Sequence, residues 1–204
     1  GNQLIDSVRG VTKHLESEDS GAESDQTEGL TAFGSDGFTV GENGAVNQDT
    51  QTYVAWCWKE SATSGFDIVS YTGDGSARTI SHSLSAKPDM MILKNRSSSG
   101  GSAQAWSVYH GSNTSAPATD RMIFNTNEAT YDTERDFDDT EPTSSVFTVG
   151  DSNRTNMDTE TYIAYLFTSI KGFSKFGGYE GNGNADGTFV LCGFRPAFVI
   201  CKAI

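Results

Sequence analysis

Oxygen-bearing side chains gather between residues 151 and 158, where a hard cation could find its ligands. The four residues are Asp151, Asn153, Asn156 and Asp158. Carboxylate and amide oxygens are the ligands that Ca²⁺ prefers, and it binds roughly six to eight of them. The spacing therefore makes this loop a candidate calcium site, and Ca²⁺ is the one cofactor that the sequence suggests.

The same loop has a second interpretation that needs no metal. Asn156 and Asp158 stand just before the stretch Thr159 to Tyr162. Short polar side chains at such positions cap turns by hydrogen bonding to the nearby backbone. Both roles are open from the residues alone, and we favour the turn.

A second group that could carry chemistry is an acidic run. Paired carboxylates held at a defined separation can hydrolyse glycosides. The run lies within six residues of a polar stretch, so we interpret it as a solvated loop. It consists of Asp136, Asp138, Asp139 and Glu141.

Nucleophilic and metal-binding motifs are missing from the rest of the sequence. The histidines His14, His82 and His110 stand far apart, and no serine or cysteine lies in a nucleophile-elbow motif. We therefore predict that the protein is not an enzyme.

An internal repeat organises the elements that must position these residues. Residues 38–55 return as residues 147–164, each match 109 positions later, and a repeat of this kind has to be recognised before the fold is assigned. The first copy of the ten identities consists of Phe38, Thr39, Val40, Gly41, Asn47, Asp49, Thr50, Thr52, Tyr53 and Ala55.

A second motif extends the repeat to the end of the chain. Gly65 and Phe66 return as Gly172 and Phe173, and from Tyr71 onward the matches lie 108 positions apart, as far as Lys202. The unit is thus the size of a domain. We predict one complete domain at residues 65–171, and a second, split domain that combines residues 1–59 with residues 172–204. Because the chain starts and stops inside repeat units, we also expect it to be a segment of a longer protein.

Composition indicates an all-β fold. The sequence is rich in glycine, with 22 residues, and carries 12 Phe, 7 Tyr and 3 Trp. Many short alternating segments separated by turns favour two antiparallel β-sandwich domains of jelly-roll type. The predicted strands are residues 38–40, 52–59, 66–71, 78–84, 89–94, 105–109, 122–124, 146–149 and 161–167.

Aromatic and thiol side chains are assigned to this core. Trp56, Trp58 and Trp106 could each stack on sugar rings. Trp56 and Trp58 match Tyr165 and Phe167 in the other copy, so we expect these two to pack in the core instead. The cysteines Cys57 and Cys201 each match a leucine in the other copy, which predicts small buried hydrophobic residues. The net charge of −13 excludes nucleic acid and anionic membranes as natural partners.

Several segments are similar to repeated aromatic-rich modules of tailed-bacteriophage virion proteins, notably marine and cyanobacterial ones. The matching segments are residues 4–10 (Leu-Ile-Asp-Ser-Val-Arg-Gly), 35–41 (Ser-Asp-Gly-Phe-Thr-Val-Gly), 53–59 (Tyr-Val-Ala-Trp-Cys-Trp-Lys), 71–73 (Tyr-Thr-Gly) and 193–198 (Gly-Phe-Arg-Pro-Ala-Phe).

This resemblance implies a structural module of a tail fibre or of another virion surface protein, with other virion proteins as partners. It implies a homo-oligomer, most commonly a trimer, and no catalytic residues. Two other functions stay open. One is a carbohydrate-binding module that attaches the particle to a host-surface glycan, and the other is a glycan depolymerase.

Overall fold

The computed structural model describes residues 1–97 and 103–204, and regular structure in this part of the chain is almost all β. The all-β prediction is therefore confirmed at the level of class. The strands are β1 (Gln3–Leu4), β2 (Lys13–Glu16), β3 (Ser24–Asp25), β4 (Leu30–Phe33), β5 (Phe38–Val40), β6 (Phe66–Thr72), β7 (Arg78–Ser81), β8 (Met90–Asn95), β9 (Ser107–His110), β10 (Asp120–Ile123), β11 (Tyr131–Asp132), β12 (Val146–Val149) and β13 (Thr161–Phe167). The helices are single turns: α1 (Gly44–Asn47), η1 (Ala62–Ser64), η2 (Pro117–Thr119) and α2 (Glu134–Phe137).

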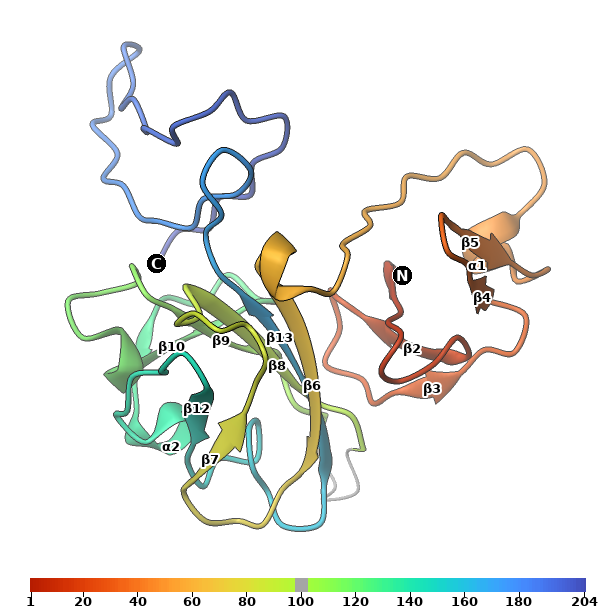
Figure 1. The fold of residues 1–204 in the computed structure, drawn as a ribbon, viewed down its shortest axis with the longest axis horizontal. Coiled ribbons are helices and arrows are strands. Elements are labelled where there is room, and N and C mark those ends of the chain that lie inside the picture. The colour runs from red at the N-terminus through yellow and green to blue at the C-terminus, as the bar shows by residue number, and fades with distance from the viewer. Residues whose placement is uncertain (98–102) are drawn as a thin grey trace.

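Six antiparallel strands form the main sheet, in the order β11-β10-β9-β8-β13-β6 (Figure 1). β13 lies between β8 and β6, so that Tyr165 is opposite Ile92 on one side and Ile68 on the other. Nearly every residue of β13 is apolar or aromatic, which suits a strand whose two faces are both covered. The sequence predicted this strand with the same bounds.

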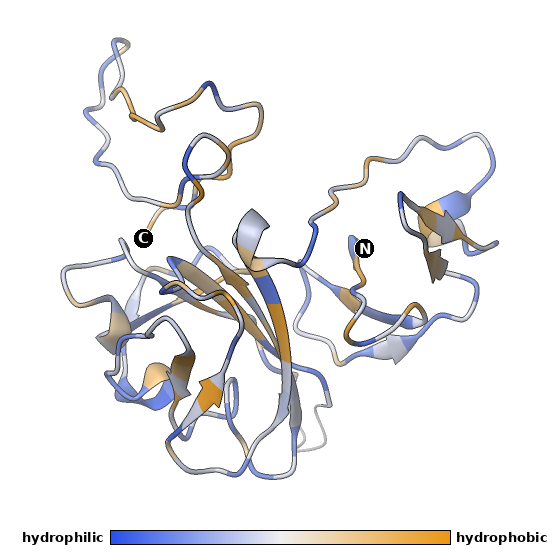
Figure 2. Ribbon diagram, viewed as in Figure 1, coloured by the Kyte–Doolittle hydropathy of each residue, from blue (hydrophilic) through white to orange (hydrophobic). Residues whose placement is uncertain are grey.

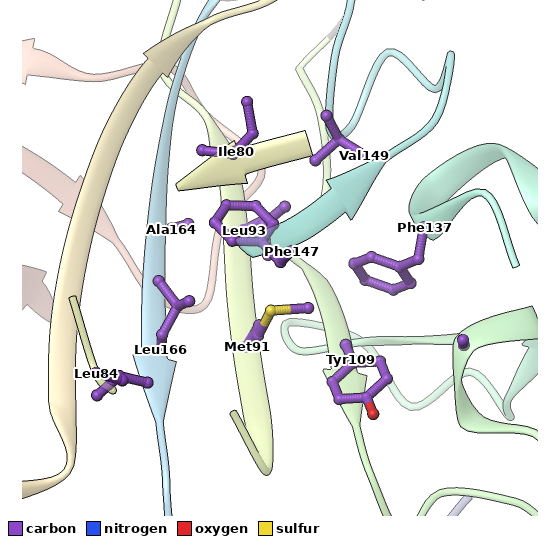
Figure 3. Packing of buried hydrophobic residues seen from close by; sticks show 11 residues of the cluster. Ile80, Leu84, Met91, Leu93, Tyr109, Phe137, Phe147, Val149, Ala164 and Leu166 are labelled. Atoms are coloured by element: carbon purple, nitrogen blue, oxygen red, sulfur yellow. The ribbon is translucent and has the colours of Figure 1, made fainter. Parts of the chain in front are cut away.

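A two-stranded sheet of β7 and β12 covers one face of the main sheet. Figure 3 shows the core between them, where Phe147 from β12 lies over Leu93 and Met91 from β8. Burying each such side chain contributes about 1.5–3 kcal/mol. This core consists of Ile80, Leu84, Met91, Leu93, Tyr109, Ala118, Phe137, Phe147, Val149, Ala164 and Leu166.

The opposite face of the main sheet is covered by the first 25 residues. They form the antiparallel sheet β1-β2-β3, and Leu15 from β2 packs on the main sheet. Successive residues of a strand point to opposite faces, so Ile163 and Tyr165 serve this second core while Ala164 and Leu166 serve the first. The second core consists of Leu15, Phe66, Ile68, Trp106, Ile163 and Tyr165.

Buried polar groups also hold this N-terminal segment in place. The Asp6 carboxylate accepts hydrogen bonds from Arg9 Nε at 2.5 Å and from the Tyr165 hydroxyl at 2.6 Å. Glu23 pairs with Arg9 at 3.2 Å and with Arg96 at 2.9 Å. Burial alone would raise the pKa of Glu23, but the hydrogen bonds and charges of Arg96 and Arg9 outweigh it and lower that pKa. The first 25 residues thus pack on the unit formed by residues 65–171.

Part of the sequence-based assignment is wrong at the level of strands. Residues 52–59 are coil in the structure, although their alternation predicted a strand, and residues 175–204 also contain no strand. β4 and β5 form a hairpin that pairs with no other strand of the described residues. A strand needs a neighbour to pair its backbone groups, and residues 52–59 have no neighbouring ladder here. The segments 1–59 and 172–204 therefore share no sheet in this structure, and hydrophobic positions recur along both coils (Figure 2).

Candidate functional site

Asn156 is the centre of the loop that the sequence marked for calcium or for a turn. Its side chain is fully buried. The Nδ2 group donates to Gly150 O at 2.9 Å, to Ser76 O at 2.6 Å and to Asp74 Oδ1 at 3.1 Å. The Oδ1 atom accepts from Asp74 N at 3.2 Å. Asn156 thereby joins the loop before β13 to the turn between β6 and β7.

Close packing explains why that turn contains glycines. A Cβ on Gly73 would lie 2.0 Å from Met157 O, and Gly75 has a φ of +73°. Both features require a residue without a side chain. The sequence repeat contained these glycines, but nothing in it indicated that Asp74 and Ser76 bind Asn156.

The other residues of the candidate calcium set turn to protein partners or to solvent. The Asp151 carboxylate pairs with Arg135 Nε at 2.8 Å, and both side chains are largely exposed. Asn153 contributes its backbone oxygen, which accepts from the Tyr162 hydroxyl at 2.8 Å. Asp158 is exposed. The bond to Gly150 gives Asn156 a structural role of the kind the turn interpretation proposes, whereas Asp151 forms an exposed ion pair, and calcium binding stays a prediction.

A small hollow of about 210 Å³ brings Asp151 near the acidic run. Its lining combines Asp138, Glu134 and Asp151 with Arg135. Arg135 balances one of these three carboxylates, that of Asp151, and this pairing raises the pKa of the guanidinium. In the described residues no group of three or more His, Cys, Asp or Glu side chains is arranged to hold a metal ion.

The acidic run is dispersed rather than gathered into a site. Asp136 lies on α2 and is fully buried, which corrects the prediction of a wholly solvated loop. Its Oδ2 accepts from Ser107 Oγ at 2.7 Å, and Arg121 lies 3.7 Å away. Asp138 and Asp139 follow the helix with positive φ angles and are exposed.

Glu141, the last member of the run, also has structural partners. Its Oε2 atom accepts hydrogen bonds from Lys87 Nζ at 2.5 Å and from the Tyr109 hydroxyl at 2.6 Å. Burial alone would raise the pKa of Glu141, but these two hydrogen bonds and the Lys87 charge lower it. Asp136 and Glu141 therefore serve different contacts, and the structure does not pair them.

Aromatic side chains outside the main unit form an exposed apolar region. Trp56 and Trp58 are 63% and 51% exposed, so the prediction that they pack in a core is wrong for this structure, whereas Trp106 is buried as a core residue. Trp56 contacts Phe198, with ring centroids 5.1 Å apart. Cys57 and Cys201 are likewise exposed and unbridged, although the repeat predicted buried side chains.

One further hollow lies between the N-terminal sheet and the chain that follows β10. It has a volume of about 550 Å³, and Glu18 is the single carboxylate among the lining residues. The lining consists of Ser17, Glu18, Phe124, Asn125, Thr126 and Asn127.

These features define a β-sheet protein whose reactive side chains mostly bind its own backbone and side chains. The chain belongs to the family described as a domain of unknown function, DUF7483, whose model matches residues 1–204. No curated protein and no solved structure matches the chain. Within the described residues, no helix has the length and apolar character to cross a bilayer.

Proposed function

We propose that this chain is a non-enzymatic structural module of a virion, displayed at the particle surface as part of a tail fibre or as a surface decoration. The observation that carries the proposal is the use of its charged groups. Asp6, Glu23 and Asp136 each bind segments distant in sequence, and so stiffen the fold. Such contacts stabilise a rigid structural module, whereas a glycosidase needs carboxylates free to face a substrate.

Attribution to a virion rests on the resemblance of the segments named above, and the fold is compatible with it. In this proposal β7 and β12 with the main sheet make one antiparallel sandwich, the form expected for the repeated modules. The net charge of −13 supports contact with other virion proteins rather than with nucleic acid.

Two experiments test this function. Antibodies raised against the chain should label intact particles in immunogold electron microscopy, and labelling confined to infected cells would contradict the location. The purified chain should release no sugar from bacterial polysaccharides. Release that disappears in the Asp139→Asn variant would instead establish a depolymerase; loss in Asp136→Asn counts only if the variant stays folded, because Asp136 is buried.

We also propose a homo-oligomer, with a trimer as the expected number from the resemblance. β6 and β11 are the edges of the main sheet, and exposed edges are commonly protected by association. Light scattering on the purified chain should give three times the monomer mass. A monomer mass over the micromolar range would contradict this.

A second candidate function is binding of a host-surface glycan. Trp56 and Trp58 are exposed and two positions apart, so in an extended chain they face the same side. Aromatic faces of this kind can stack on sugar rings. A glycan array would detect such binding, and the loss of signal in Trp56→Ala but not in Trp106→Phe would locate it.

A further inference from the structure

The C-terminal segment, residues 172–204, reproduces local features of the chain that forms β6 and the turn after it. Gly172 has a φ of +78° and Gly65 a φ of +68°, and Gly183 matches Gly75 at +66° against +73°. Asn182 Oδ1 accepts from Asn184 N at 3.0 Å. The matching Asp74 Oδ1 accepts from Ser76 N, also at 3.0 Å.

The first copy of the long repeat reproduces the other half of the unit in the same way. Asn47 Nδ2 donates to Gly41 O at 2.8 Å, as Asn156 Nδ2 donates to Gly150 O at 2.9 Å. The Tyr53 hydroxyl donates to Gly44 O at 2.7 Å, as that of Tyr162 donates to Asn153 O at 2.8 Å.

Each segment lacks the partners that the other would supply. Asn156 also binds Asp74 and Ser76, and the repeat counterparts of those residues are Asn182 and Asn184. β13 is paired on both sides, by β6 and β8. Their counterparts are residues 173–179 and 198–203, in the C-terminal segment.

Both segments expose apolar side chains that would be buried in a complete unit. Val54, in residues 38–59, is 86% exposed, and Phe189, in residues 172–204, is also 86% exposed. So many exposed apolar side chains on two segments are unusual for a soluble protein and indicate an interaction site. The remaining exposed members are Phe38, Tyr53, Trp56, Trp58, Phe173, Tyr179, Val190, Leu191, Phe198, Val199, Ile200 and Ile204.

The two segments start from the same place. They leave the unit of residues 65–171 at the same end of the β6–β13 pair, where Thr168 N donates to Gly65 O at 2.8 Å. Figure 1 shows both departures at that end of the two strands. The contact between Trp56 and Phe198 already joins the segments within one chain.

We propose that residues 172–204 dock on residues 38–59 of the same chain and complete a second antiparallel sheet, with residues 52–58 as its central strand between residues 173–179 and 198–203. The occupant of the exposed apolar surface is thus the chain's own C-terminal segment. Docking pairs the backbone of residues 52–58 on both sides and reduces the exposure of the side chains along this strand. Trp56 and Trp58 then lie within a sheet, so the glycan function requires the face that carries them to stay uncovered.

The register follows from the unit that is already folded. In that unit Leu166 is opposite Met91, and Ala164 is opposite Leu93. The repeat transfers these pairs to Cys57 opposite Val199, and Ala55 opposite Cys201. The native cysteine Cys57 therefore offers a direct test of the register.

The test is disulfide formation in Val199→Cys, in a background with Cys192→Ser and Cys201→Ser. We expect an intrachain disulfide between positions 57 and 199, seen as a mobility shift on non-reducing gels and identified by peptide mass spectrometry. The matched control is Ile200→Cys in the same background, because its side chain points to the other face of the strand. It should form at least about fivefold less disulfide.

Equal oxidation of the two variants, or a disulfide-linked dimer in place of the intrachain bond, would overturn the proposal. Hydrogen exchange on the unmodified chain guards against a variant that fails to fold. Amides of residues 53–58 should be protected as those of β13 are. Exchange of residues 53–58 at the rate of free coil would also overturn it.

Discussion

Residues 38–55 and residues 147–164 are two copies of one sequence motif, and they have opposite environments. Phe147, Tyr162 and Ile163 are fully buried, whereas their counterparts Phe38, Tyr53 and Val54 are 44%, 48% and 86% exposed. Even so, the turn in the middle of the motif is the same in both copies. Thr50 has a φ of +64° and Thr159 a φ of +65°.

The difference separates local from tertiary causes. A turn is closed by atoms a few residues apart, so it forms wherever the motif occurs. Burial of the strand after the turn needs two neighbouring strands and an opposing sheet. β6 and β8 supply the neighbours for the second copy, and the first copy lacks them in this structure.

The largest effect expected from this comparison comes from truncating the matched phenylalanines. Phe147→Ala should lower the free energy of unfolding by about 3–5 kcal/mol, because it leaves a cavity in the core. Phe38→Ala should cost less, about 1–2 kcal/mol, through the docked C-terminal segment. Urea titrations of both variants measure this. Equal losses would break the comparison, and no loss for Phe38→Ala would count against docking.

The matched asparagines test the turn itself. Asn156→Ala should lower the free energy of unfolding by about 2–3 kcal/mol, because the buried Gly150 carbonyl loses its partner and the bonds to Asp74 and Ser76 are lost as well. Asn47→Ala removes the bond to Gly41 at an exposed site and should cost about 0.5–1 kcal/mol. Chemical denaturation gives both values. A larger loss for Asn47→Ala would reverse the order that burial predicts.

Lys94, on β8 opposite Ile163, makes the stability of the unit around the buried copy sensitive to pH. Burial lowers its pKa to about 8, while the carbonyl oxygens of Ser20, Asn95 and Gln104 hold the ammonium. Unfolded lysine titrates near 10.4, so between these values the unfolded chain binds more protons and stability rises with pH.

We expect the free energy of unfolding to rise by about 1–2 kcal/mol between roughly pH 8 and 9.5, and the rise to be lost in Lys94→Met. The window stops there because burial raises the pKa of Tyr162 to about 12. Tyrosines of the unfolded chain ionise near pH 10, which lowers stability above it. Parallel profiles for the two proteins would contradict the assignment to Lys94.

The smallest effect concerns calcium at Asp151, Asn153, Asn156 and Asp158. Because Asn156 and Asp151 already have protein partners, thermal melts with calcium and with a chelator should share one midpoint. A higher midpoint in calcium that is lost in Asp158→Ala would establish the metal site instead. The outcome decides whether the loop differs between the two copies in chemistry as well as in burial.

Local patterns were sufficient for much of the fold. Period-two alternation and apolar runs predicted β13 and β12 at the bounds found, and turn residues predicted the turn between β6 and β7. The same reasoning failed for residues 52–59, since alternation describes a strand's faces but not the presence of its neighbours. The same reasoning assigned the acidic run to a solvated loop. Burial of a carboxylate such as Asp136 depends on partners elsewhere in the chain, and its own position in the sequence does not reveal them.

By itself the sequence determined the all-β class, the repeat of domain size and the hydrogen-bonded turn that both copies share. These depend on residue type and on atoms close along the chain. Only the tertiary structure decided that the first 25 residues cover the second face of the main sheet, and that Asp6, Glu23 and Asp136 bind distant segments. Such contacts join residues far apart in the chain, and their energies depend on burial, which no local pattern contains.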